Sequence, residues 1–285
     1  KAAPEPTQEK TELTPTPEAT KTVAQSQTPD RGKSISSPHE GSAEGWLADP
    51  DQFRDYLSEE REDLEERVDE EIEAEKSRDL TVLEQALERS GSYQKIVEKV
   101  IHEEDFDHKF LSSRIPSLLP GLIFVESKGK PETTSSAGAV GLCQIKEGTA
   151  KDIAAELGVS EYNLEDPETN IKFSLKYLEG LYRYFPEEGL ALWSYHLGMG
   201  NMVDAISHYL GRADLTIDNA FLGDPPLVAK LILNNRINFE NLVKSRFVKE
   251  QIRDGKFDDD TQHYYTRILA ADWLIGQSVQ LEAAA

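Results

Sequence analysis

The sequence has a single cysteine, Cys143, among 285 residues. One cysteine can form neither an internal disulfide nor a cysteine-rich zinc site. The six histidines are scattered, without the paired spacing used by zinc enzymes. We therefore expect no metal and no other cofactor. No run of about 18 apolar residues occurs, so the sequence predicts no membrane-spanning helix.

Basic residues are scarce relative to acidic ones. The chain has 31 Lys and Arg against 53 Asp and Glu, which gives a formal net charge of −22. Such a balance repels nucleic acids and anionic membrane surfaces, so we expect no nucleic-acid partner. The chain begins at Lys1 rather than Met, and we expect a leader that is not part of this sequence.

Large apolar side chains are almost missing from residues 1–45. This segment instead combines Thr, Ser, Gln and Glu with six prolines: Pro4, Pro6, Pro15, Pro17, Pro29 and Pro38. A chain of this composition buries too little surface to offset the entropy lost on ordering. We predict a disordered linker that gives the following domain reach from an anchor.

Residues 46–90 form an acidic segment. Between residues 41 and 90 there are eighteen acidic and six basic side chains, which accounts for more than half of the net charge. From about residue 50 to 90 a narrow apolar stripe has helical spacing, with Phe53, Leu57, Leu64 and Val68. We predict a solvated helical extension that packs on the domain or pairs with a protein partner.

The remainder, residues 91–285, has the pattern of successive helices with short connections, and strand signals are poor. We therefore predict an all-α fold. Breaks at Gly158, at Pro186 and between Gly211 and Pro226 separate the helices. After residue 126 we expect helices near 147–158, 168–184, 188–210, 225–251 and 259–280.

Glu126 directly follows an apolar stripe. Its members are Ile115, Leu118, Leu119, Leu122 and Val125. A carboxyl beside a buried face is poorly solvated, so its protonated form is favoured, as a general acid at neutral pH requires. Because Pro120 and Gly121 interrupt the stripe, the helix before Glu126 either begins at Pro120 or is kinked there.

Small and amide side chains follow Glu126. Ser135, Gly138 and Gly141 would let a backbone approach a ligand closely, and Gln144 could hydrogen-bond sugar hydroxyls or N-acetyl groups. Beside Gln144, Cys143 is expected to be a small buried thiol.

These residues resemble the signature of the soluble lytic transglycosylase family, which is related to goose-type lysozyme. The matching positions are Glu126-Ser127, Pro131, Ser135, Gly138-Ala139, Gly141-Leu142, Gln144-Ile145 and Thr149-Ala150. The resemblance covers roughly residues 92–280 and implies a lysozyme-like helical catalytic domain with Glu126 as the catalytic residue. Asn170 matches a family helix start, where we expect it to act as a cap.

Two further family elements supply candidate substrate-binding residues. The segment 194–202 places Tyr195 as a ring lining the cleft and His196 where the family usually has Asn, so we assign His196 to binding rather than catalysis. In the late Thr-x-x-Tyr-Tyr motif, the resemblance implies that Tyr264 points its hydroxyl toward the catalytic carboxyl. Adjacent helical residues face about 100° apart, so Tyr265 cannot do the same.

The resemblance implies cleavage of peptidoglycan glycan strands. Glu126 would protonate the oxygen between N-acetylmuramic acid and N-acetylglucosamine, and a 1,6-anhydro end would form. The alternatives are a lysozyme-like hydrolase, with a second acid among Asp166, Glu179 and 258–260, and an inactive glycan-binding or scaffold module. The implied location is the bacterial periplasm or cell envelope.

Overall fold

The structure, a computed structural model, describes residues 61–284, and almost every regular element in that range is a helix. The predicted linker, residues 1–45, and residues 46–60 of the extension lie outside the described residues. The first helices are α3 (Arg61–Lys76), α4 (Leu80–Ser92), α5 (Gln94–Glu103), α6 (His108–Ser112), α7 (Leu119–Ser127), α8 (Glu147–Leu157) and α9 (Pro167–Tyr184). They are followed by α10 (Glu188–Leu197), α11 (Met199–Leu210), α12 (Ile217–Ala220), α13 (Leu227–Asn235), α14 (Phe239–Val243), α15 (Arg246–Arg253), the short 3-10 helix η1 (Asp259–His263) and α16 (Tyr264–Ala284).

The prediction of an all-α fold is confirmed, although several predicted helices are divided. The described part of the acidic segment, residues 61–90, forms two helices, because Asp79 caps a new helix by accepting from the amides of Thr81 and Val82. The predicted helix 188–210 is broken at Gly198, where φ is 85°. The region 225–251 contains three short helices. One pair of two-residue strands, β1 (Ala139–Val140) and β2 (Ile145–Lys146), was not predicted.

Helix α7 packs more extensively against α16 than against any other described element. A Cβ at Gly121 would lie 2.5 Å from the backbone oxygen of Ile268, so only glycine permits so close an approach. Pro120 is in the first turn of α7, as expected for a helix that begins there rather than one that is kinked. The two helices thereby hold Glu126, near the end of α7, beside Tyr264, at the start of α16.

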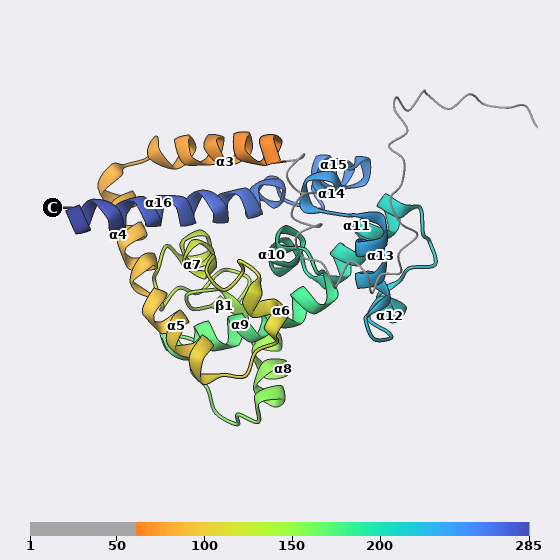
Figure 1. The fold of residues 1–285 in the computed structure, drawn as a ribbon, viewed down its shortest axis with the longest axis horizontal. Coiled ribbons are helices and arrows are strands. Elements are labelled where there is room, and N and C mark those ends of the chain that lie inside the picture. The colour runs from red at the N-terminus through yellow and green to blue at the C-terminus, as the bar shows by residue number, and fades with distance from the viewer. Residues whose placement is uncertain (1–60, 285) are drawn as a thin grey trace, which may run out of the picture. The chain divides into compact units, whose positions relative to one another are not determined.

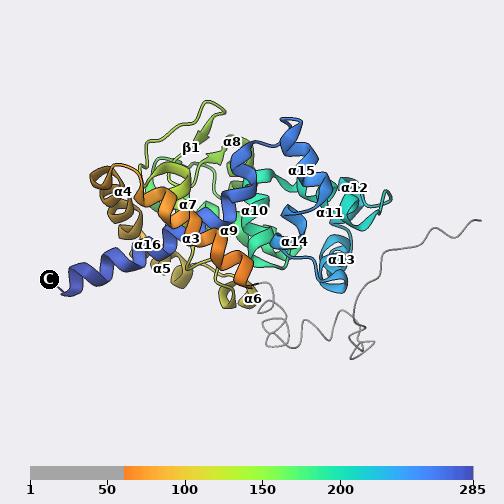
Figure 2. The same cartoon turned by 90° about the horizontal axis from the view of Figure 1, so that it is seen from above.

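Helices α3 and α4 cover the other side of α16. Figure 1 shows α3 alongside α16, and Figure 2 shows the same pair from above. A small apolar cluster joins these elements and includes Ile72, Leu83, Leu87, Phe124 and Leu274. Residues 64–90 therefore pack directly on the two helices that carry Glu126 and Tyr264. In residues 61–284 no helix is both long and apolar enough to cross a membrane.

Candidate active site

Glu126 lies in the last turn of α7, and the residue as a whole is half-buried. The hydroxyl of Tyr264 donates to its Oε1 across 2.5 Å. Burial raises the pKa of Glu126 to about 7, while the Tyr264 hydrogen bond and the positive charge of Arg267 act in the opposite direction. A carboxyl of this kind is protonated in a useful fraction of molecules near neutrality and can still ionise.

Tyr264 and Tyr265 point in different directions, as adjacent helical residues must. Tyr264 is buried against Glu126, whereas Tyr265 packs edge-on against Phe239 with the ring centroids 5.1 Å apart. Burial and the neighbouring Glu126 hold the pKa of Tyr264 well above its ordinary value. Tyr264 thus remains a neutral hydrogen-bond donor, and Tyr265 is a core residue.

His196 stacks on the ring of Tyr264. The two rings are stacked at 4.6 Å with an interplanar angle of 20°, and the imidazole Nε2 is 3.5 Å from Asp258 Oδ1. Thr261 donates to the same oxygen of Asp258 across 2.7 Å. His196 therefore contacts the phenol that contacts Glu126, and its ring does not reach Glu126 by any hydrogen bond in the described residues.

Tyr195 connects α10 to the loop after Glu126. Its hydroxyl donates to the backbone oxygen of Cys143 across 2.8 Å and lies 3.3 Å from Ser174 Oγ. The charge of Glu126 contributes to raising the pKa values of both Tyr195 and Cys143, so the three groups lie near one another. Cys143 is fully buried, as expected. Ser174 was not singled out from the sequence, because a serine inside a helix carries no motif.

Gln144 adopts a left-handed backbone conformation, with φ of 52°. Its side-chain nitrogen donates to the backbone oxygens of Thr133 and Gly141, at 3.0 and 2.9 Å. The amide nitrogen therefore stabilises the loop. In the described residues Oε1 accepts no hydrogen bond, so this oxygen is the atom that a ligand donor could contact.

Ser135 and Gly138 form a turn in the same loop. The Ser135 hydroxyl oxygen accepts from the Ala139 amide at 3.0 Å, and the Gly138 amide donates to the Ser135 backbone oxygen at 3.0 Å. Gly138 has φ of 77° with open space where a Cβ would be. The structure gives these two residues a role in the shape of the loop and does not link them by a hydrogen bond to Glu126.

Asn170 fastens this loop to α9. Its side-chain nitrogen donates to the backbone oxygens of Val140 and Leu164, and its side-chain oxygen accepts from the Cys143 amide at 2.9 Å. The expectation that Asn170 caps the helix was wrong: Asp166 is the N-cap, and Asn170 lies inside the first turns. These contacts of Asn170 require glycine at position 141, because a Cβ added there would lie 2.1 Å from the Asn170 side-chain nitrogen.

The acids considered as partners of Glu126 have other contacts. Asp166 accepts from the Thr169 amide and hydroxyl, and Glu179 accepts from the Asp107 amide. Asp258 is nearer to the site, but through His196 and Tyr264. No carboxylate is among the groups that shift the pKa of Glu126.

Glu187 shows that a raised pKa alone does not identify an active site. Burial raises the pKa of Glu187 to about 7, despite hydrogen bonds from three backbone amides. Two of them, from Gly189 and Leu190, begin α10, and the third comes from Phe239. Glu187 therefore caps a buried helix. Glu126, in contrast, accepts a hydrogen bond from the Tyr264 side chain and is only half-buried as a residue.

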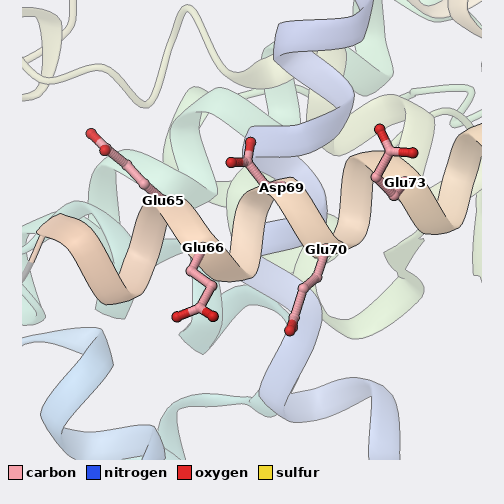
Figure 3. A pocket seen from close by; sticks show the side chains of 5 residues that line it. All are labelled: Glu65, Glu66, Asp69, Glu70 and Glu73. Atoms are coloured by element: carbon pink, nitrogen blue, oxygen red, sulfur yellow. The ribbon is translucent and has the colours of Figure 1, made fainter.

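The acidic extension has a separate surface feature. Glu65, Glu66, Asp69, Glu70 and Glu73 line a surface pocket on α3, and Figure 3 shows their carboxyl groups along that helix. All five are exposed. Among residues 61–284 no group of three His, Cys, Asp or Glu side chains is arranged to hold a metal ion. This acidic face is turned away from the contacts with α16.

Comparisons with known proteins bear on the segment that contains Glu126. Residues 112–215 match the family model described as "Transglycosylase SLT domain". A transglycosylase of Enterobacteria phage PRD1 is 37% identical over 116 residues, which are 40% of this chain and 41% of that protein. A soluble lytic murein transglycosylase of Salmonella typhimurium is 33% identical over 94 residues, 31% of this chain and 15% of that protein.

The chain thus matches less than half the length of these two relatives. Among solved structures, the 70 kDa soluble lytic transglycosylase of Escherichia coli is similar with a TM-score of 0.42 and 22% identity, over 65% of this chain and 24% of that one. Residues 112–215 therefore resemble a transglycosylase SLT domain, and the two relatives named transglycosylases are similar to this chain over part of its length only. Tyr264 and the whole of α3 lie outside the matched segment.

Proposed function

We propose that this chain is a peptidoglycan lytic transglycosylase in which Glu126 is the single catalytic acid. The observation that carries the proposal is the carboxyl of Glu126, whose pKa burial raises to about 7 and which accepts a hydrogen bond from Tyr264. Its place in an SLT domain, and the names of the relatives, which are transglycosylases, indicate the substrate class. The periplasm or cell envelope is the location that such a substrate requires.

The proposed reaction uses Glu126 twice. Protonated Glu126 donates its proton to the oxygen between C1 of N-acetylmuramic acid and C4 of N-acetylglucosamine, and the C1–O bond breaks. The resulting carboxylate then takes the proton of the muramic C6 hydroxyl as that oxygen bonds to C1. The product is a 1,6-anhydro ring, no water is consumed, and Glu126 is protonated again. Attack from within the same sugar provides a high effective concentration of nucleophile, so no second carboxylate is needed.

The other proposed binding residues surround this centre. Tyr264 orients the Glu126 carboxyl, and Tyr195 with His196 would line the glycan cleft beside it. Gln144 would accept a hydrogen bond from the sugar through Oε1, since its nitrogen is bonded to the loop. Ser135 and Gly138 would shape the loop over the glycan strand. An acidic partner surface on α3 remains a prediction from charge alone.

The test is mass spectrometry of fragments released from purified peptidoglycan. A transglycosylase releases muramic ends that are lighter by one water than hydrolytic ends. Glu126→Gln is the matched inactive variant, because the amide is nearly isosteric but cannot donate the proton, and it should lose roughly 10² to 10⁴ in rate. Reducing muramic ends as the main product would establish a hydrolase instead, with Asp258 as the first acid to examine. Full activity of Glu126→Gln would refute both enzymatic assignments to this residue.

A further inference from the structure

Helix α3 has two chemically different faces. Its outward face carries the exposed acids of Figure 3. Its inward face carries Arg67, Glu71 and Glu75, which are spaced by four residues and so lie on one side of the helix. Each of these three makes a polar contact with a side chain far away in the sequence. The inward face is therefore a row of specific polar contacts rather than a solvated surface.

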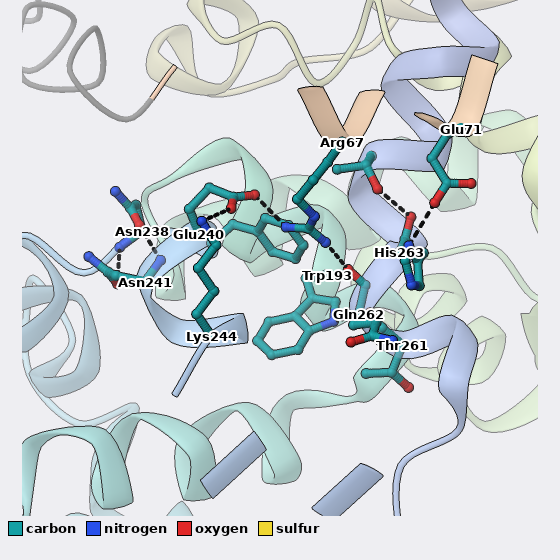
Figure 4. Close-up of polar contacts among 12 residues, drawn as sticks. Arg67, Glu71, Trp193, Asn238, Glu240, Asn241, Lys244, Thr261, Gln262 and His263 are labelled. Carbon is teal, nitrogen blue, oxygen red and sulfur yellow. Dashed lines mark hydrogen bonds and ion pairs between the residues drawn. The ribbon is translucent and has the colours of Figure 1, made fainter. Parts of the chain in front are cut away.

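Arg67 is the most deeply engaged of the three. One guanidinium nitrogen donates to Glu240 Oε1 at 2.6 Å, and the other donates to the backbone oxygen of Gln262. The guanidinium also lies over the Phe239 ring, 5.4 Å from its centroid. Glu240 is buried, and Lys244 lies 3.2 Å from its second oxygen. Figure 4 shows Arg67 reaching from α3 between Glu240 and Gln262.

Gln262 belongs to η1, the turn that leads directly into Tyr264. Three successive carbonyl oxygens of this turn accept hydrogen bonds from side chains. Trp193 Nε1 donates to Thr261 at 2.7 Å, Arg67 donates to Gln262, and Thr266 Oγ1 donates to His263 at 3.0 Å. In addition, Glu71 Oε1 lies 2.7 Å from His263 Nδ1. Helix α3 thus supplies one contact to the backbone of this turn, from Arg67, and one to the side chain of His263, from Glu71.

The third residue of the inward face, Glu75, lies near α7, the helix that carries Glu126. Glu75 Oε1 is 3.8 Å from the ammonium of Lys128, two residues after Glu126. That ammonium lies over the Phe124 ring, 3.6 Å from its centroid. Burial lowers the pKa of Lys128 to about 8, and Glu75 opposes this shift. Contacts from one helix therefore bear on the residues next to both Glu126 and Tyr264.

We propose that α3 is part of the active-site assembly and that Arg67 is a positioning residue: by holding the Gln262 carbonyl it fixes η1, and η1 sets where the Tyr264 hydroxyl meets Glu126. This inference rests on the proposed function. It assigns a catalytic contribution to a helix outside the matched SLT segment, residues 112–215. The acids on the outward face of α3 make none of these contacts and have no such role.

The test compares steady-state rates on soluble glycan strands. Arg67→Met alone would remove an ion-pair partner of the buried carboxylate of Glu240, which could unfold the protein. The main variant is therefore Arg67→Met combined with Glu240→Gln. We expect kcat to fall about tenfold and KM to stay within about twofold, because the orientation of the acid is lost and glycan contacts are kept. Glu66→Gln and Asp69→Asn, on the outward face of the same helix, are the matched controls and should leave both constants unchanged. Circular dichroism and the melting temperature establish that each variant is folded.

The decisive measurement repeats the comparison in a Tyr264→Phe background. If Arg67 acts through the Tyr264 hydroxyl, the tenfold loss should shrink to less than about twofold when that hydroxyl is absent. The same loss in both backgrounds, or a change confined to KM, overturns the positioning role. Tyr264→Phe and Glu126→Gln serve as the reference: if neither slows cleavage, the proposed function itself is wrong, whereas a large effect of both with an additive Arg67 effect overturns only this inference.

Discussion

Replacing Tyr264 by phenylalanine removes the phenol oxygen that donates to Glu126 across 2.5 Å. Burial is the main cause of the raised pKa of Glu126, about 7, and the hydrogen bond opposes it because it favours the carboxylate. Without the donor the pKa must rise further. A hydrogen bond to a charged group is worth about 1.5 kcal/mol or more, and 1.36 kcal/mol equals one pKa unit. We therefore expect the carboxyl of the variant to titrate at about pH 8.

Two consequences for the rate can be separated by pH. At its optimum the variant should be about tenfold slower than wild type, because the acid is less well oriented. At pH 8, however, roughly a tenth of wild-type Glu126 is protonated, against roughly half in the variant, while at pH 6 both are almost fully protonated. The ratio of variant to wild-type activity should therefore rise about fivefold from pH 6 to pH 8.

The assay is the release of soluble fragments from purified peptidoglycan across this pH range, with circular dichroism to establish folding at each pH. The groups around Glu126 are Tyr264 and Arg267 from α16, Tyr195 from α10 and the thiol of Cys143. His196 stacks on residue 264, so His196→Asn is made in both backgrounds as a control for the stacked imidazole ring. An alkaline limb of the variant that is unchanged, or displaced to lower pH, would refute the assigned hydrogen-bond geometry.

Three further predictions concern the loop at Gly141, the Glu126 carboxyl and the Cys143 thiol. Gly141→Ala should lower the free energy of unfolding by about 3 kcal/mol or more in denaturant titration, because its Cβ would lie 2.1 Å from the Asn170 side chain. Gly138→Ala is the control: its Cβ would lie in open space, so it should cost about 1 kcal/mol. Equal costs would contradict the close contact between Gly141 and Asn170. The pKa of Glu126 in the folded state, about 7, exceeds its ordinary value of 4.5. Because the folded state binds this proton more tightly, the wild type loses stability as the pH rises between these two values. Glu126→Gln should therefore have a higher melting temperature than wild type at pH 8 but not at pH 4.5. Cys143 is buried and its pKa is raised to about 12, so iodoacetamide at pH 8 should leave it unmodified in the folded protein and alkylate it in urea; mass spectrometry reads the result.

Local signals accounted for the helices and for the central residue of the site. The apolar stripe before Glu126 predicted a poorly solvated carboxyl, and the structure places it at the end of a buried helix. The choice of Tyr264 over Tyr265 came from the family resemblance, and helix geometry added only that one of two adjacent residues can face a given point. The break at Asp79 was also encoded locally, but the continuous acidic composition concealed it.

The missing information lay in side-chain choices and in long-range contacts. Nothing local shows that the Gln144 nitrogen bonds its own loop, since that depends on the left-handed backbone at this residue. Asn170 is a residue type that often caps helices and lies near a helix start, but in the structure its side chain makes hydrogen bonds to the loop instead. The bond from Arg67 to Gln262 spans 195 residues, and in an acidic helix a single inward arginine has no pattern that distinguishes it from a solvated one.

The hydrogen bond between Tyr264 and Glu126 joins residues that are 138 positions apart, which has a consequence during synthesis. A ribosome makes the SLT segment, with its complete glutamate motif, well before it makes α16. Contacts of such high sequence separation form late, because the intervening chain must first be ordered. A nascent chain that has emerged only as far as residue 255 has its acid but no tyrosine beside it, and α7 has no α16 to pack on. The proposed cleavage of glycan strands would therefore become possible only after α16 has been made.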